Sequence, residues 1–171
     1  RPEFRAFEVV VNVQGDEPFV RRTHLRPAIG LVAGGGWEIG TAATPIRSLD
    51  EYRDPAAVKV VRAPDAAALY FSRSPIPHLR DAEPAAADFA TGAFLRHLGI
   101  YVYSAAALQR WVALPEGELE RIERLEQLRP LAAGLRIGVA VVEPIDGGVD
   151  TPADAYEAEL RLREEFSATS S

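Results

Sequence analysis

A run of β-branched residues, Glu8-Val9-Val10-Val11-Asn12-Val13, is followed at once by the polar segment Gln14-Gly15-Asp16-Glu17-Pro18. Valine-rich runs with little alternation of apolar and polar residues are typical of strands buried on both faces of a mostly parallel sheet. Glycine and proline then end the pairing of the strand. The pattern predicts an α/β protein in which polar side chains follow the carboxyl end of a buried strand.

Other segments on the C-terminal side of this strand alternate between strand and helix patterns. Strands are predicted at 38–46, 58–62, 67–72, 97–103 and 137–142, and helices at 22–33, 104–111, 116–129 and 152–166. The capping-box spacing of Ser48-Leu49-Asp50-Glu51 predicts a further short helix, and the Ala63-Pro64-Asp65 turn predicts a hairpin between the strands 58–62 and 67–72. This alternation predicts a three-layer α/β sandwich with a mostly parallel central sheet. Because no internal repeat or linker interrupts the pattern, we expect residues 1–171 to form a single domain.

Composition excludes several classes of function. The chain has 171 residues, and 19 Lys and Arg against 25 Asp and Glu give a net charge of −6, which argues against sequence-independent nucleic-acid binding. It has no cysteine, which excludes a disulfide scaffold, a thiolate zinc site and a cysteine nucleophile. No apolar run approaches the roughly 18 residues of a membrane span. It also has no methionine, from which we expect the natural chain to extend further on the N-terminal side.

Two aspartates follow predicted strands. Asp16 ends the first strand, and Asp150 follows the last strand and precedes the helix that begins near Pro152. Ligands of open α/β sheets bind beyond the carboxyl ends of strands, and Mg²⁺ is held by one or two carboxylates together with water. The two aspartates could therefore clamp one magnesium ion. The alternatives are an ordinary turn at Asp16 and a helix N-cap at Asp150.

The predicted strand 97–103 has two different faces. Strand alternation places His97, Gly99, Tyr101 and Tyr103 on one side, opposite a purely aliphatic side. Polar rings beside a glycine, which leaves room, are typical of a ligand-binding wall. The alternative is a histidine that faces solvent or is hydrogen-bonded within the core.

The predicted helix 116–129 contains a misplaced charge. On a helical wheel Glu126 falls inside the apolar sector, whereas Gln127 lies on the flank. A carboxylate among apolar residues is costly unless it is paired or binds a ligand. The alternative to a ligand is an ion pair with Arg124 or Arg129.

Two arginines come after the predicted hairpin strand. Arg73 follows Ser72 directly, and Arg80 lies in the proline-rich segment 74–90. The guanidinium group matches carboxylate and phosphate in bidentate geometry, so these residues could supply a local positive field for an anionic ligand. The alternative is that both are solvated loop residues.

These segments together resemble a known family, the 3-deoxy-manno-octulosonate cytidylyltransferases or CMP-Kdo synthetases, over nearly the whole chain. Each string is weak alone, and their common order makes the resemblance strong. The strings are Val11-Asn12-Val13-Gln14-Gly15-Asp16-Glu17-Pro18, Ala43-Thr44-Pro45-Ile46, Val58-Lys59-Val60-Val61, Ala68-Leu69-Tyr70-Phe71-Ser72-Arg73-Ser74-Pro75-Ile76-Pro77, His97-Leu98-Gly99-Ile100-Tyr101, Leu125-Glu126-Gln127-Leu128-Arg129 and Gly148-Val149-Asp150-Thr151-Pro152.

The resemblance implies a nucleotide-diphospho-sugar transferase-like fold and a Mg²⁺-dependent reaction. In that reaction CTP and 3-deoxy-D-manno-octulosonate (Kdo) give CMP-Kdo and pyrophosphate for lipopolysaccharide assembly, with Asp16 and Asp150 as catalytic magnesium ligands. It also implies a cytoplasmic enzyme, usually a homodimer, that binds neither nucleic acid nor a membrane. The implied Kdo pocket consists of Gln14, Arg73, Arg80, His97, Tyr101, Glu126 and Gln127.

The chain also departs from the family pattern. The family's N-terminal loop for the CTP phosphates has no counterpart in these 171 residues, so we expect an N-terminally incomplete catalytic domain that does not turn over CTP alone. Pro130 follows the Leu-Glu-Gln-Leu-Arg string, which predicts a bend in the helix there. Two other functions remain open: activation of another acidic sugar, such as an amino-Kdo or a sialic acid, and a non-catalytic protein that binds a sugar acid.

Overall fold

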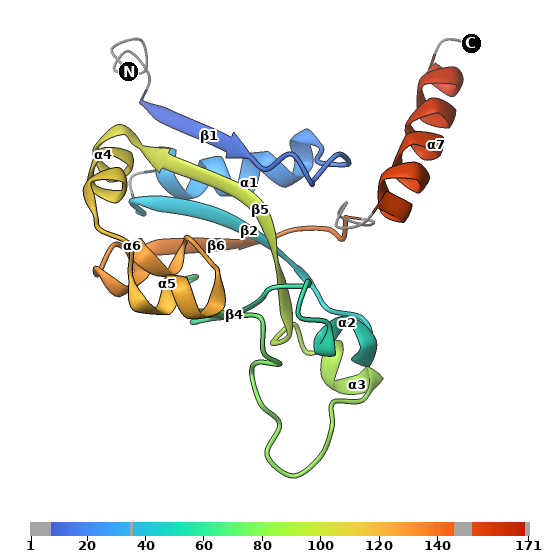
Figure 1. The fold of residues 1–171 in the computed structure, drawn as a ribbon, viewed down its shortest axis with the longest axis horizontal. Helices are drawn as coiled ribbons and strands as arrows, with labels where there is room; N and C mark the ends of the chain where they lie inside the picture. Colours follow the sequence, from blue (N-terminus) through green and yellow to red (C-terminus); the bar gives the residue numbers. More distant parts are fainter. Residues whose placement is uncertain (1–7, 35, 146–151, 170–171) are drawn as a thin grey trace.

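A six-stranded sheet runs through the computed structural model, which describes residues 8–34, 36–145 and 152–169 (Figure 1). One edge strand of the sheet, β1, pairs with the long strand β5 and lies off the main strand order. That main order is β4 (Ala68–Ser72), β3 (Lys59–Arg62), β5 (Leu95–Ser104), β2 (Ile39–Pro45) and β6 (Ile137–Val141), and β1 spans Val9–Val13.

The sheet is mixed rather than mostly parallel, which corrects that part of the prediction. Among the described strands only β2 and β6 pair in parallel, whereas β5 is antiparallel to β1, β2 and β3, and β3 is antiparallel to β4. An apolar run reports burial and carries no information on the direction of the neighbouring strand. The β3–β4 hairpin needs only a tight turn, so its antiparallel pairing was predicted correctly.

Helices cover both faces of the sheet, which confirms the three-layer α/β architecture. Helix α1 (Arg22–Ala33) packs Ala28 and Val32 against the aliphatic face of β5. The opposite face holds an aromatic core that includes Tyr101, Tyr103 and Trp111. Its covering helices are α4 (Ala105–Ala113), α5 (Glu118–Glu123) and α6 (Leu128–Ala132), in front of the sheet or at its end in Figure 1.

Strand β1 is less buried than its sequence predicts. Val11 is 39% exposed and Val13 is 38% exposed, because β1 pairs with β5 on one side only among the described residues. The expectation of burial on both faces is therefore wrong for this strand. The long strand β5 has that property instead, since every residue from His97 to Tyr103 is buried.

The predicted helix 116–129 is two short helices, which is a second correction. Helix α5 ends at Arg124, whose φ of 53° is left-handed, and α6 begins at Leu128. A left-handed residue cannot continue an α-helix, so the chain turns between them. Pro130 lies in the first turn of α6, where its missing N–H costs no helical hydrogen bond, so it neither bends nor ends a long helix.

Two small helices and a long loop extend from one end of the sheet (Figure 1). Helix α2 (Leu49–Arg53) begins as predicted, with the Ser48 hydroxyl accepting a hydrogen bond from the Glu51 N–H at 3.1 Å. An aromatic cluster that includes Phe94 joins it to α3 (Ala86–Phe89). The last helix, α7 (Pro152–Thr169), was also predicted, and Ala158 is buried on it.

Candidate active site

A cavity of about 710 Å³ opens beside the middle of β5. On that edge, β1 pairs with residues 100–104 and β3 pairs with Leu95 and Arg96, so the two strands diverge around residues 97–99. The cavity also reaches α2 and the turn between α5 and α6. Its charged and polar lining residues are Gln14, Asp16, Glu17, Asp50, Glu51, Asp54, Arg73, Arg96, His97, Tyr101, Arg124, Glu126 and Gln127.

The structure brings together seven of the nine predicted site residues. They come from four places in the chain: the turn after β1, the end of β4, strand β5 and the α5–α6 turn. Their roles stay predictions. The seven residues are Gln14, Asp16, Arg73, His97, Tyr101, Glu126 and Gln127.

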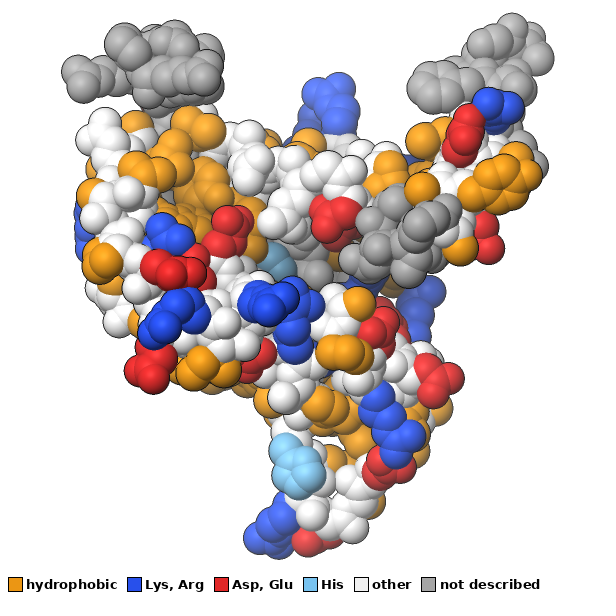
Figure 2. Space-filling view, viewed as in Figure 1, with side chains coloured by type: hydrophobic (Ala, Val, Ile, Leu, Met, Phe, Trp, Pro, Cys, Tyr) orange, Lys and Arg blue, Asp and Glu red, His pale blue; other side chains and the backbone are white. Residues whose placement is uncertain are grey.

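The other two predicted site residues differ in their outcome. Arg80 does not line the cavity: its side chain is 89% exposed and pairs with Asp81 at 3.2 Å, on the loop that projects away from the sheet (Figures 1 and 2). The solvated alternative therefore describes Arg80 in this structure. Asp150 lies outside the described residues.

The turn after β1 is attached to β5 by its backbone and by Glu17. The Gln14 N–H donates to the Gly99 carbonyl at 2.8 Å, and the Gly99 N–H donates to Glu17 Oε1 at 3.2 Å. A Cβ on residue 99 would lie 2.4 Å from Gln14 Oε1, so only glycine leaves room for this side chain. Asp16 is exposed at the cavity and makes no hydrogen bond with another described residue. The turn thus has a structural role through Glu17 and leaves the Asp16 carboxylate available.

The predicted two faces of β5 are confirmed, although both are buried. Leu98 and Ile100 contribute to the core under α1, whereas Tyr101 belongs to the aromatic core and also reaches the cavity. Burial raises the pKa of the Tyr101 hydroxyl well above its usual value, and the nearby Glu126 carboxylate raises it further. The Tyr101 hydroxyl is therefore a neutral hydrogen-bonding group at physiological pH.

His97 is hydrogen-bonded in the core and lines the cavity as well. Its Nε2 lies 2.8 Å from the hydroxyl oxygen of Thr41, and its ring contacts Phe71 edge-on with centroids 5.1 Å apart. Burial, followed by the positive charge of Arg96, lowers the pKa of His97 to about 3. The imidazole is therefore neutral at physiological pH. The alternative of a histidine hydrogen-bonded in the core is confirmed, and a role of His97 in ligand binding stays a prediction.

Arg73 connects the end of β4 to two other segments. Its Nε donates to the Glu123 carbonyl at 2.9 Å, and its Nη1 donates to the Pro55 carbonyl at 2.9 Å. The Glu123 carboxylate in turn accepts from the Ser72 hydroxyl at 2.6 Å and from the Arg73 N–H at 2.9 Å. This network fixes the guanidinium at the cavity wall. Its remaining N–H donors can meet a ligand anion.

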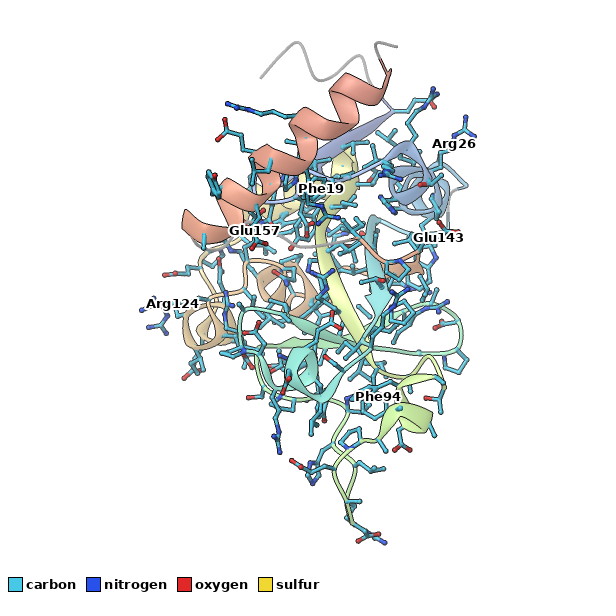
Figure 3. The ribbon with its side chains drawn as sticks, turned by 90° about the vertical axis from the view of Figure 1, so that its right-hand side faces the viewer. Phe19, Arg26, Phe94, Arg124, Glu143 and Glu157 are labelled. Carbon is cyan, nitrogen blue, oxygen red and sulfur yellow. The ribbon has the colours of Figure 1, made fainter. Side chains whose placement is uncertain are left out.

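The turn between α5 and α6 places Glu126 and Gln127 differently from the helical-wheel prediction. Glu126 is exposed at the cavity, outside any helix, and Gln127 is only 2% exposed. Arg129 does not pair with Glu126 but donates to both carboxylate oxygens of Glu120, at 2.7 and 2.5 Å. The wheel argument for Glu126 was therefore wrong in its geometry, because it assumed an unbroken helix. Figure 3 shows the Arg124 guanidinium directed outward, away from this turn.

Sequence reasoning missed several charged residues of the cavity. Arg96 Nε lies 3.0 Å from Glu51 Oε1, and Arg96 Nη2 donates to the Ile145 carbonyl at 2.9 Å. Lys59 does not line the cavity itself; it is fully buried, donates to the carbonyl of the lining residue Asp54 at 2.6 Å, and has a pKa that burial lowers. Charged residues inside the strands 58–62 and 95–104 were the available signal, since such strands are otherwise apolar.

The described residues contain no preformed metal cluster. Within residues 8–34, 36–145 and 152–169 no group of three or more His, Asp or Glu side chains is placed to hold an ion. Mg²⁺ needs fewer protein ligands, since one or two carboxylates and a substrate phosphate suffice. Exposed Asp16 suits that requirement. Among the helices that the structure describes, none combines the length and apolar character needed to cross a membrane.

Comparison with known proteins shows the class. A family model described as cytidylyltransferase matches residues 3–137, so the chain belongs to the cytidylyltransferase family. A solved CMP:2-keto-3-deoxy-manno-octonic acid synthetase in complex with CTP matches the structure with a TM-score of 0.79 and 36% identity, over 96% of this chain and 66% of that one. A putative glucose-1-phosphate thymidylyltransferase from Bacillus anthracis, 14% identical with a TM-score of 0.52, covers 94% of this chain and 57% of its own and shares the fold.

Curated relatives point to one member of that class. A 3-deoxy-manno-octulosonate cytidylyltransferase from Gemmatimonas aurantiaca is 52% identical over 92% of this chain, and one from Xanthomonas euvesicatoria is 48% identical over 90%. The chain spans about 60% of the length of each of these relatives.

Proposed function

We propose that the protein transfers CMP from CTP to Kdo, giving CMP-Kdo and pyrophosphate for lipopolysaccharide biosynthesis. The observation that carries this proposal is the charged cavity beside β5, in a chain 52% identical to a 3-deoxy-manno-octulosonate cytidylyltransferase. In this reaction the anomeric hydroxyl oxygen of Kdo attacks the α-phosphorus of CTP and gives up its proton. A new P–O bond to the sugar forms, and the bond between the α-phosphorus and the bridging oxygen of pyrophosphate breaks, so that pyrophosphate leaves.

The mixture of charges in the cavity suits an acidic sugar. Kdo has one carboxylate and several hydroxyl groups, so it needs a cationic partner and a set of acceptors. Arg73 is fixed by backbone carbonyls and has donors left for the sugar carboxylate. The exposed Glu126 carboxylate can accept sugar hydroxyls, and the buried amide of Gln127 can both donate and accept. We assign Gln14, His97 and Tyr101 to the same pocket.

We propose that Mg²⁺ is the cofactor and that Asp16 and Asp150 hold it. Asp16 is the exposed carboxylate at the cavity, and hard oxygen ligands of this kind are those that Mg²⁺ prefers. Bound magnesium would neutralise phosphate charge and promote ionisation of the attacking hydroxyl. Asp16 places one negative charge at the cavity, beside the proposed sugar pocket. The phosphate end of CTP and the sugar must meet there.

We also propose that the enzyme works in the cytoplasm, where CTP is made, and that it forms a homodimer. Family resemblance supports the dimer. Light scattering coupled to size-exclusion chromatography of the full-length protein tests it, with an expected mass of twice the chain.

The substrate is tested by pyrophosphate release. Full-length protein with CTP and Mg²⁺ is assayed against Kdo, an amino-Kdo and a sialic acid, with CMP-sugar formation followed in parallel. We expect Kdo to give the highest kcat/KM. Preference for another acid would overturn the choice of Kdo, and binding of Kdo with no pyrophosphate release would indicate a non-catalytic sugar-acid-binding protein.

Removing the charge of Asp16 tests its assignment as a magnesium ligand. Asp16→Asn should lower kcat by about 10³-fold, the size of effect seen when a charge-stabilising group is removed from an active site. Its folding should be unchanged, because Asp16 is exposed and surface changes are small in stability. The matched control is Asp65→Asn, at an exposed aspartate in the turn between β3 and β4, outside the cavity. An Asp16→Asn enzyme with the activity of the control would contradict the metal role.

A further inference from the structure

A single hydroxyl behind the cavity contacts both β5 and the histidine of the site. Thr41 lies on β2 and is 0% exposed. Its Oγ1 is 2.7 Å from the Ile100 carbonyl oxygen and 2.8 Å from His97 Nε2. A β-bulge at this point shifts the pairing of β2, so that Thr41 faces Tyr101 whereas Ala42 faces Leu98. Beside this bulge the Thr41 hydroxyl donates to the backbone of β5 at Ile100.

Hydrogen-bond chemistry assigns the direction of both contacts. A carbonyl oxygen can only accept, so the single Thr41 hydroxyl proton points to the Ile100 carbonyl. Toward His97 the Thr41 oxygen must then accept, which requires a proton on Nε2. A neutral imidazole carries one ring proton, so Nδ1 is left with a lone pair.

The surroundings of the ring keep it neutral and in one orientation. Burial lowers the pKa of His97 to about 3, so a second ring proton is absent at physiological pH. The ring is packed between Phe71 and Tyr101, with centroid distances of 5.1 and 5.3 Å. His97 nevertheless lines the cavity, and its Nδ1 makes no hydrogen bond with any residue that the structure describes.

We propose that Thr41 is a positioning residue that holds His97 in the Nε2-protonated tautomer, so that Nδ1 is presented to the cavity as a hydrogen-bond acceptor for a hydroxyl group of the sugar acid. This inference rests on the proposed function for the identity of the ligand. The tautomer itself depends only on Thr41, Ile100 and His97. The consequence is selectivity: a ligand that places a donor at this point is bound, and one that places a carbonyl or carboxylate oxygen there is not.

Nitrogen NMR tests the tautomer without any ligand. The chain has three histidines, and the ¹⁵N signals of His97 can be assigned with His24→Gln and His78→Gln variants. We expect a protonated Nε2 and a bare Nδ1 in the unaltered protein. Thr41→Val removes the acceptor and should put ring proton density on Nδ1, whereas Thr41→Ser should restore the original pattern. A His97 that carries its proton on Nδ1 in the unaltered protein overturns the proposal.

A second threonine supplies the matched control. Thr44 lies on the same strand and is 1% exposed, and its hydroxyl has no hydrogen-bond partner among the described residues. Thr44→Val therefore makes the same chemical change at equal burial without touching a histidine. Its His97 spectrum should equal that of the unaltered protein. A changed spectrum in Thr44→Val would show that loss of any buried hydroxyl on β2 disturbs the ring, and the proposal would fail.

Steady-state kinetics on the full-length protein tests the consequence for the ligand. Thr41→Val should raise the KM for Kdo roughly tenfold, the cost of one hydrogen bond in a binding site, with the KM for CTP unchanged and kcat within about threefold. Thr41→Ser should recover most of the loss. An equal rise in both KM values, or none, would contradict the positioning role. If Thr41→Val does not fold, the NMR spectrum of the unaltered protein and the kinetics of Thr41→Ser decide. Absence of turnover in the unaltered protein overturns the proposed function alone, since the tautomer is measured separately.

Discussion

Arg73 at the cavity wall and Arg80 in the proline-rich loop after β4 were both predicted to be site residues, and the two regions differ in how they hold the arginine side chain. Arg73 donates to backbone carbonyls of two separate segments and is half-buried at the cavity. Among the residues that the structure describes, the Arg80 side chain pairs only with its neighbour Asp81, and both side chains are more than 80% exposed. Backbone carbonyls at fixed positions orient a guanidinium, whereas an adjacent, solvated carboxylate does not.

The same contrast separates the two acidic partners. Glu120 is 10% exposed in its side chain and receives two hydrogen bonds from Arg129 across the break between α5 and α6. That pair fixes the turn that carries Glu126 and Gln127 to the cavity. Asp81 has no comparable role, because its loop projects away from the sheet (Figure 1). The placement of a side chain at the cavity therefore depends on contacts behind it, such as the Glu120–Arg129 pair behind Glu126 and Gln127.

Among the variants that test this contrast, the largest effect is expected from replacing each of the two arginines with glutamine. Arg73→Gln should lower kcat/KM for Kdo by at least about 10²-fold. It removes the cation proposed to bind the sugar carboxylate, and it breaks the hydrogen bonds that hold the segments around Glu123 and Pro55 at the cavity. It should also lower the free energy of unfolding by about 2 kcal/mol, since it deletes the hydrogen bonds to the Glu123 and Pro55 carbonyls. Arg80→Gln should change the free energy of unfolding by less than about 0.5 kcal/mol. Urea denaturation and kinetics measure both; an Arg80→Gln loss as large as that of Arg73→Gln would show that the loop closes over the cavity.

A smaller effect is expected from two tyrosines on the same face of β5. Tyr101 lines the cavity, whereas Tyr103 is hydrogen-bonded to Asn12 and does not. Tyr101→Phe should raise the KM for Kdo about tenfold through loss of one hydrogen bond. Tyr103→Phe should leave the KM unchanged and cost stability of about 1 kcal/mol. Equal KM values for the two variants would place the sugar elsewhere.

The smallest effect concerns pH and stability. The Arg129 hydrogen bonds lower the pKa of Glu120 below its ordinary value of 4.5. A carboxyl whose pKa is lower in the folded state stabilises the fold above its unfolded pKa, and this contribution is lost as pH falls through the folded pKa. Glu120→Gln should therefore lower the melting temperature at pH 7, and the difference from the unaltered protein should shrink below about pH 4.5. Asp81→Asn should show no such dependence, and a pH-independent difference for Glu120→Gln would contradict the ion pair.

Sequence patterns predicted those features of the fold that are local. The strand at β5 and its two faces, the Ser48 cap and the β3–β4 hairpin each depend on residues a few positions apart, and each is confirmed. The direction of β1 and the break at Arg124 are not local. The direction of β1 depends on which strand lies alongside it. The break depends on the left-handed backbone of Arg124 and on the Glu120–Arg129 pair, which joins the two helices across it.

The site could be predicted in part for the same reason. Polar residues next to strand ends, such as Asp16 and Arg73, were visible in the chain, and the fold brings them together. The helical-wheel argument for Glu126 was wrong because it assumed one unbroken helix, although the turn between α5 and α6 does bring Glu126 to the cavity. Arg96 and Glu51 were missed because strand and helix patterns assign them to solvent, whereas contacts between distant segments half-bury them at the cavity.

Chemical-shift mapping by NMR tests the central claim most directly, namely that the cavity beside β5 binds the sugar acid. Kdo is titrated into the ¹⁵N-labelled protein, and the backbone amides are followed. The account predicts saturable shifts at Gly99, Tyr101 and Gln127 and none at residues 78–83 of the loop. Shifts confined to the loop, or no shifts at any of these amides, would contradict it.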